Sequence, residues 1–374
     1  DFMKENKTIS RLALRVSYGL TAKMNEEAIN ANAIYKSGIV NRHSLDDRES
    51  KFNILHLENR DLTWEKMYEL NIGAELGLFD NRISTTLDIY QRNTFDLIDL
   101  VRTSGVGGQY YKYANFGDMR TRGIELGIHT KNIVTEDFKW STSLTVSAMD
   151  QKITRLLNSP NAFDMVAGRG RGNIVDYPRG SLFSFNFQGL NNQGLPTFDF
   201  GRYPSNQSEL SKIAGADFLD AQYAKSYLIY HGPIEPRIIG GLSNTLKYKN
   251  WELSFFLTVQ AGNKIRLNPT FDPEFADLNI FSKSYYNRWL NPGDEYKTDV
   301  PVLPSQELIA AVGKENIERA YNTYDYSQQR VADGSFVRMK NISLAYTVPE
   351  NFLKKIRLHS MNLNLNLTNP FLIY

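Results

Sequence analysis

The chain has 374 residues, and its 43 Lys and Arg against 41 Asp and Glu give a net charge of +2. This near balance argues against a nucleic-acid-binding protein, which usually carries a clustered basic excess, and the absence of cysteine excludes disulfides, thiolate metal sites and cysteine nucleophiles. No apolar run approaches the ~20 residues of a membrane-spanning helix. A helical membrane protein is therefore excluded, but a membrane β-barrel, whose strands alternate in polarity, is not.

Nine strands are predicted in chain order from period-two alternation of apolar and polar residues. Most are about ten to thirteen residues long, which exceeds the usual length of strands in soluble proteins and matches the ~9–11 residues with which a tilted strand crosses a bilayer. Their ranges are 9–20, 68–78, 82–92, 121–130, 138–150, 237–248, 251–261, 334–346 and 356–368.

The alternation is clearest in residues 139–147 (KWSTSLTVS) and 251–259 (WELSFFLTV). We expect the apolar side to face lipid and the polar side to face a wet lumen, although the solvated face of a sandwich sheet would look similar. The apolar side carries Trp140, Leu144, Val146, Leu253, Phe255 and Leu257, and the polar side carries Ser141, Ser143, Glu252 and Ser254.

Short and long connections alternate between these strands. Short links are predicted at 79–82, 131–137, 248–251 and 347–355, and long segments at 21–67, 93–120, 151–235 and 262–333. Loops this long are uncommon in compact soluble domains, whereas membrane barrels have short periplasmic turns and long extracellular loops. The pattern predicts an all-β, antiparallel transmembrane β-barrel with long extracellular loops. An odd strand count and abrupt ends predict a piece of a larger barrel.

The sequence contains no pattern typical of an enzyme. None of the five histidines has a partner at the i, i+4 spacing, and no HExxH, GxSxG or phosphate-loop motif occurs. The glycine-rich stretch 168–172 is interpreted as a loop, because no GK[ST] and no helix follow it. We therefore predict no catalytic activity, no metal site and no cofactor.

Two aromatic clusters fall in the predicted loops. They pack the loops against one another, or they form a stacking surface for a sugar or peptide; the first interpretation is favoured, and the second makes them candidate substrate-binding residues. The candidates are Tyr110, Tyr111 and Tyr113 in the first cluster, and Tyr285, Tyr286 and Trp289 in the second.

Several separated blocks, in consistent order, resemble one protein family. They are 12–21 (LALRVSYGLT), 59–79 (NRDLTWEKMYELNIGAELGLF), 115–126 (NFGDMRTRGIEL), Arg288-Trp289 with Pro292-Gly293-Asp294, and 333–349 (DGSFVRMKNISLAYTVP). Together with shorter matches they cover about residues 10 to 369. On these blocks the sequence resembles the SusC/RagA-type TonB-dependent outer-membrane transporters of Bacteroidetes.

The resemblance implies transport rather than catalysis. It implies that residues 1–374 are the C-terminal portion of a barrel of about 22 strands, with the plug domain, the TonB box and the last barrel strands absent from this chain. Such a protein imports a glycan or an oligopeptide across the outer membrane together with a SusD-like surface lipoprotein. Energy reaches it from the TonB-ExbB-ExbD complex through the missing N-terminal part.

Two other function classes remain as alternatives. A passive outer-membrane porin or adhesin barrel would have the same strands without a plug. A soluble β-rich carbohydrate-binding protein would stay in solution without detergent, whereas apolar outer faces predict aggregation.

Overall fold

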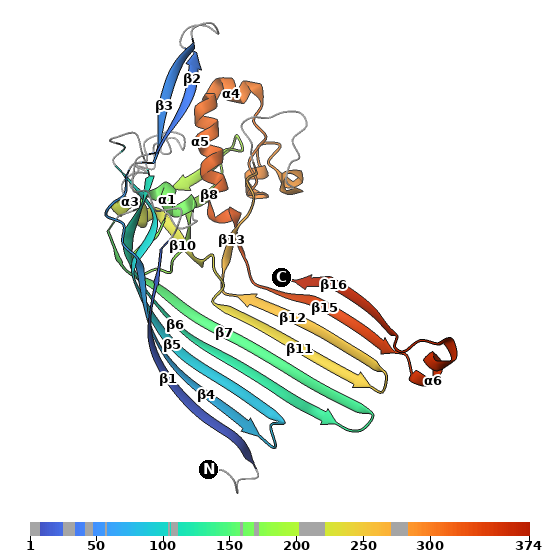
Figure 1. The fold of residues 1–374 in the computed structure, drawn as a ribbon. Coiled ribbons are helices and arrows are strands. Elements are labelled where there is room, and N and C mark those ends of the chain that lie inside the picture. Colours follow the sequence, from blue (N-terminus) through green and yellow to red (C-terminus); the bar gives the residue numbers. More distant parts are fainter. Residues whose placement is uncertain are drawn as a thin grey trace.

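The computed structural model describes residues 8–24, 34–41, 48–56, 58–103, 105, 111–157, 160–167, 172–201, 221–270 and 283–374. Its main element is a nine-stranded sheet in which each strand pairs antiparallel with the next strand of the same sheet (Figure 1). In order across the sheet, the strands are β1 (Ile9–Lys23), β4 (Glu65–Leu78), β5 (Ile83–Arg102), β6 (Tyr111–Val134), β7 (Phe138–Leu156), β11 (Ile238–Tyr248), β12 (Trp251–Ala261), β15 (Phe336–Thr347) and β16 (Asn362–Ile373).

All nine predicted strands are confirmed, although several of their bounds differ from the prediction. Strands β5, β6 and β7 continue well beyond the predicted ranges toward the long loops. The prediction that a strand begins at residue 356 was wrong, because residues 354–356 form a 3-10 turn and the strand begins at Asn362. Arg357 ends that turn in the left-handed conformation, with φ 57°.

The connections at one end of the sheet are short. Phe79, Asp80 and Asn81 all have φ between 53° and 58° in the turn between β4 and β5, and Lys249 has φ 51° in the turn between β11 and β12. The fourth link at this end, residues 348–361, is longer than predicted. It contains the short helix α6 (Glu350–Leu353) followed by the 3-10 turn Lys354–Ile356 (Figure 1).

The connections at the other end fold into a layer of their own, seen above the sheet in Figure 1. Among the described residues, no helix is long and apolar enough to cross a membrane. The layer and its neighbouring hairpin contain β2 (Ile34–Asn41), β3 (Arg48–His56), α1 (Ala162–Ala167), β8 (Ser181–Leu190), β9 (Pro196–Asp199), α3 (Ala221–Tyr227), β10 (Leu228–Pro233), β13 (Lys264–Arg266), α4 (Gln306–Val312), α5 (Lys314–Asp325) and β14 (Val331–Asp333).

The register of the sheet separates an apolar face from a polar face. Ile72, Ile89 and Ile124 are neighbours on β4, β5 and β6 and are all exposed, although their strands lie inside the sheet. A soluble monomer rarely exposes so continuous an apolar surface, so this face is the one that meets lipid. One row across it contains Leu12, Leu76, Thr85, Ile128, Leu144, Leu242, Leu257 and Met339.

An aromatic row crosses the apolar face at the short-turn end. Phe138 pairs with Tyr248, Tyr248 with Trp251, and Trp251 with Tyr346, so the row spans β7, β11, β12 and β15. The rings of Trp251 and Tyr346 have centroids 4.4 Å apart. Tyr and Trp prefer the interface between hydrocarbon and water. The row therefore marks one boundary of the membrane.

Candidate functional site

The polar face of the sheet is the first part of the candidate site, and ion pairs line it. The register puts Arg15 of β1 next to Gly73 of β4, and Gly73 next to Asp88 of β5. Arg15 reaches across β4, with 3.1 Å from Nη1 to Glu75 and 2.9 Å from Nη2 to Asp88. A Cβ on Gly73 would lie 2.6 Å from Asp88 Oδ1 and 2.9 Å from Arg15 Nε. Because Gly73 has no side chain, the ion pair between Arg15 and Asp88 can lie flat against the polar face of the sheet.

A second glycine supports an aromatic side chain on the same face. The Tyr90 ring lies across Gly123 of β6, where a Cβ would be only 2.4 Å from the ring. The guanidinium of Arg92 covers the same ring at 4.1 Å from its centroid and pairs with Glu69 at 2.6 Å. Such partly exposed ion pairs each contribute about 0–1 kcal/mol. Their effect is a flat polar wall rather than a large gain in stability.

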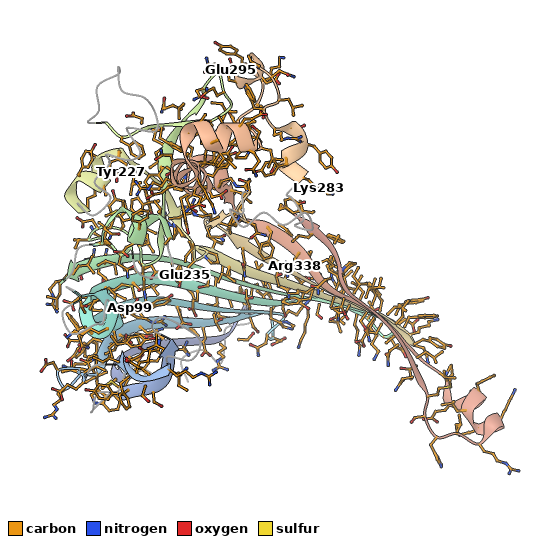
Figure 2. The ribbon with its side chains drawn as sticks, turned by 90° about the horizontal axis from the view of Figure 1, so that it is seen from above. Asp99, Tyr227, Glu235, Lys283, Glu295 and Arg338 are labelled. Carbon is orange, nitrogen blue, oxygen red and sulfur yellow. The ribbon has the colours of Figure 1, made fainter. Side chains whose placement is uncertain are left out.

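Charged side chains continue this wall toward the loops. Asp96 occupies a bulge in β5 with φ 58°, and its N–H donates to Asp118 Oδ1 at 3.2 Å. Asp118 in turn accepts from Arg155 Nε at 2.6 Å. Beyond them, Arg179 Nη2 lies 3.0 Å from Asp99 Oδ2. Polar groups therefore follow β5, β6 and β7 up to the loop layer, and Figure 2 places Asp99 in that region.

The loop layer has a hydrophobic core of its own. Tyr321 of α5, Phe185 of β8 and Phe198 of β9 are almost fully buried in it. Aromatic pairs hold it together, including a stacked pair of Phe185 and Tyr227 with centroids 6.3 Å apart. Figure 2 shows Tyr227 within this layer. The loops are thus a folded platform, as the packing interpretation of their aromatic residues predicts.

Arg266 of β13 contacts three parts of the loop layer: α1, β8 and the residue that follows α5. Its Nη2 donates to the carbonyl oxygens of Phe183 at 2.6 Å and Val166 at 3.1 Å, and its guanidinium covers the Tyr326 ring at 5.0 Å. Burial lowers the pKa of Arg266 to about 10, so it remains charged. It lines a cavity of about 770 Å³ between β13 and α5. Its Nη1 and Nη2 groups donate to backbone carbonyls, which gives it a structural role there, while its buried Nε has no hydrogen-bond partner among the described residues.

A neighbouring histidine is held in its neutral form. His231 Nε2 lies 2.6 Å from the hydroxyl of the buried Ser184. Burial lowers the pKa of His231, and the nearby cations Arg266 and Lys264 lower it further. Lys264 is itself paired with Asp333 at 2.8 Å. Protonation of His231 would place a third positive charge near those of Arg266 and Lys264.

The aromatic residues proposed from the sequence lie in different environments. Trp289 is 8% exposed and belongs to the loop core, and Tyr285 is also buried, which raises its pKa to about 12. Tyr286 is 86% exposed. In the other cluster, Tyr113 is half-buried on β6, Tyr111 begins that strand, and Tyr110 lies outside the described residues. The candidates of the second cluster therefore do not form a single exposed surface, because only Tyr286 among them is largely exposed.

The loop around Trp289 shows why that residue is buried. Its Nε1 donates to Glu295 Oε2 at 2.9 Å, and the N–H of Gly293 donates to the same oxygen at 2.8 Å. Asp294 accepts from the N–H groups of Asn291 and Leu290, and these bonds lower its pKa. The sequence signal for this turn is the stretch Pro292-Gly293, which is followed directly by the carboxylates Asp294 and Glu295.

The residues of the polar wall were not proposed from the sequence. Their signal was present, because Arg15, Glu75 and Asp88 occupy polar positions of the alternation and Gly73 lies between them. Among the described residues, no group of three or more His, Cys, Asp or Glu side chains is arranged to hold a metal ion.

Comparison with known proteins assigns the family. The profile of the TonB-dependent receptor-like β-barrel matches residues 8–256, which is more than half of the chain. The chain belongs to this family. It is a segment of an outer-membrane β-barrel, which excludes the alternative of a soluble carbohydrate-binding protein.

Relatives match over most of this chain but over only part of their own length. TonB-dependent receptor P3 of Formosa agariphila is 27% identical over 97% of this chain and 35% of its own length. TonB-dependent receptor SusC of Bacteroides thetaiotaomicron is 26% identical over 71% of this chain and 26% of its own. The chain thus spans about a third of these family members or less.

A solved structure of the RagAB peptide transporter has the same fold. It superimposes with a TM-score of 0.71 and 24% identity, covering 100% of this chain and 38% of the solved one. The RagAB peptide importer in its open-open state gives a TM-score of 0.68 at 23% identity. The family, its outer-membrane location and the open arc of strands agree with the resemblance drawn from the sequence.

Proposed function

We propose that this chain is the C-terminal portion of the barrel of a TonB-dependent importer that carries a nutrient across the outer membrane. The observation that carries the proposal is the division of the sheet into two faces. One face is apolar and meets lipid, and the other carries flat ion pairs that lead into a folded loop layer. This is the arrangement that a wet transport path under an extracellular platform requires.

The cargo is a glycan or an oligopeptide. Family membership supports nutrient import, and proteins of similar fold and sequence are named as a peptide transporter and as SusC. Tyr286, with its exposed ring, is the residue of the second aromatic cluster best placed to contact cargo. Tyr285 and Trp289 are both buried, and Trp289 belongs to the loop core.

A SusD-like lipoprotein is the proposed partner at the loop layer, and the TonB-ExbB-ExbD complex is the proposed energy source. Support comes from the size of the layer, which offers a folded surface built from residues 160–167, 172–201, 221–235 and 283–333. The relatives are named as receptors and transporters, so we propose no enzymatic activity.

The test is uptake by cells that express the full-length transporter. Labelled oligopeptides and glycans are offered separately, and uptake is compared between the parent and a variant without its TonB box. We expect one cargo class to accumulate in the parent and its accumulation to be lost in the variant. Uptake that survives both removal of the TonB box and collapse of the proton gradient would support the passive porin and contradict the proposal.

A further inference from the structure

The link between β15 and β16 differs from the other turns at its end of the sheet. The turns at 79–82, 135–137 and 249–250 are tight, whereas residues 348–361 contain α6 and a 3-10 turn. We call residues 350–361 the basic knuckle. The N–H of Leu358 donates to the carbonyl of Leu353 at 3.0 Å, and Leu353 is 2% exposed. The knuckle is therefore a folded unit rather than a loose loop.

The knuckle begins at the membrane boundary defined by the aromatic row. Tyr346, the last member of that row, lies four residues before Glu350 in the sequence. Figure 1 shows α6 at the end of the sheet opposite the loop layer. This end carries the short turns, which in outer-membrane barrels face the periplasm. The segment thus lies at the level of the inner-leaflet headgroups.

The exposed side chains of the knuckle combine apolar and cationic groups. Phe352 is 57% exposed, and Leu358 and Met361 are also exposed. Lys355 and Arg357 have no ion-pair partner among the described residues. Lys354 lies 3.8 Å from Glu350, but both side chains are largely exposed, so this pair is weak.

We propose that the basic knuckle binds phospholipid of the periplasmic leaflet. Phe352, Leu358 and Met361 insert at the boundary between headgroups and acyl chains, and Lys354, Lys355 and Arg357 bind the lipid phosphates. Amphipathic segments with aromatic and apolar groups beside Lys and Arg bind membrane surfaces in this way. Phospholipid is the expected ligand because the lipid-facing surface of β15 continues directly into the knuckle. The proposal rests on the barrel lying in the membrane and is independent of transport.

The first test measures the depth of Phe352. A nitroxide is placed by Phe352→Cys in the full-length transporter in nanodiscs that contain phosphatidylglycerol, and its collisions with oxygen and with a water-soluble nickel complex are compared. Leu253→Cys on the apolar face is the control for lipid, and Tyr286→Cys in the loops is the control for water. We expect the label at 352 to favour oxygen, as Leu253→Cys does. A label exposed to nickel, or shielded from both reagents by other protein, would overturn the proposal.

The second test measures lipid selectivity. Phosphatidylglycerol and phosphatidylcholine are supplied together, and the lipids retained by the purified transporter are identified by native mass spectrometry. Lys354→Gln with Lys355→Gln should reduce retained phosphatidylglycerol by on the order of tenfold. The matched control is Lys314→Gln with Arg319→Gln, which removes two cations from α5 and should leave retention unchanged. Equal retention by parent and knuckle variant would contradict phosphate binding.

Discussion

Replacing Leu144 by arginine tests which face of the sheet meets lipid. Leu144 lies on β7 between Ile128 and Leu242 in the apolar row. It is six positions along the strand from Phe138 in the aromatic row. With ~3.3 Å per residue and a tilt of ~40°, this places Leu144 about 15 Å from the membrane boundary. That depth is close to the middle of the hydrocarbon core.

The expected cost follows from this depth. A lipid-facing arginine at the bilayer midplane destabilises a barrel by about 2–4 kcal/mol. Thr145→Arg is the matched control, because Thr145 is the next residue at almost the same depth but lies on the polar face. Its neighbours in the register are Gly127 and Gly241. An arginine side chain at this position can extend away from the sheet into the wet lumen. We expect Thr145→Arg to cost less than about 1 kcal/mol.

The assay is denaturant unfolding of the full-length transporter in phospholipid vesicles, with parent and both variants compared. Equal stability of Leu144→Arg and the parent would refute the assignment of the apolar face. A larger loss for Thr145→Arg than for Leu144→Arg would show that the two faces are reversed.

Three further predictions concern the polar wall and the loops. Gly123→Ala should cost about 1–3 kcal/mol in unfolding assays, because its Cβ would overlap the Tyr90 ring, and Tyr90→Ala should relieve most of that cost. The pKa of His231 is lower in the folded loops than in the unfolded loops, so the unfolded loops bind a proton more readily. The stability of the loop layer should therefore be complete above pH ~6.5 and fall below it. His231→Gln should reduce this pH dependence, as measured by limited proteolysis. Trp289→Ala should destabilise the loop layer by about 3–5 kcal/mol, whereas Tyr286→Ala should leave its stability unchanged and weaken cargo binding.

Different results would contradict each of these arguments. An additive cost of Gly123→Ala in the Tyr90→Ala background would mean that the ring is not the obstacle. An unchanged pH profile after removal of the imidazole would assign the dependence to another group. Normal cargo affinity after loss of the Tyr286 ring would remove this residue from the binding surface.

The strands were predictable because lipid on one side and water on the other impose a strict alternation. At the upper ends of β5, β6 and β7 the alternation no longer applies. There Leu97, Phe116 and Ile153 form a small buried cluster, with packing partners rather than lipid around them. The period-two signal therefore ended before the strands did, and these strands were predicted too short.

The sequence predicted that the loops pack around aromatic residues, but not which of these residues are buried. The aromatic content of the loops indicated a packed core, which the burial of Trp289 and Tyr321 confirms. Which rings are buried depends on contacts between distant segments. Arg266, for example, joins carbonyls on α1 and β8 that lie far from it in the sequence. Substrate binding by the loop aromatics stays a prediction.

The most direct test of the central claim is a cryo-electron microscopy structure of the full-length transporter in lipid nanodiscs. The account predicts that β1 and β16 each pair with a strand outside residues 1–374, which removes the unpaired edges that hydrocarbon cannot satisfy. It also predicts Leu144 against lipid and Arg15 toward the lumen. Pairing of β1 with β16 in a closed nine-stranded pore, or lipid against Arg15 and Asp88, would contradict it.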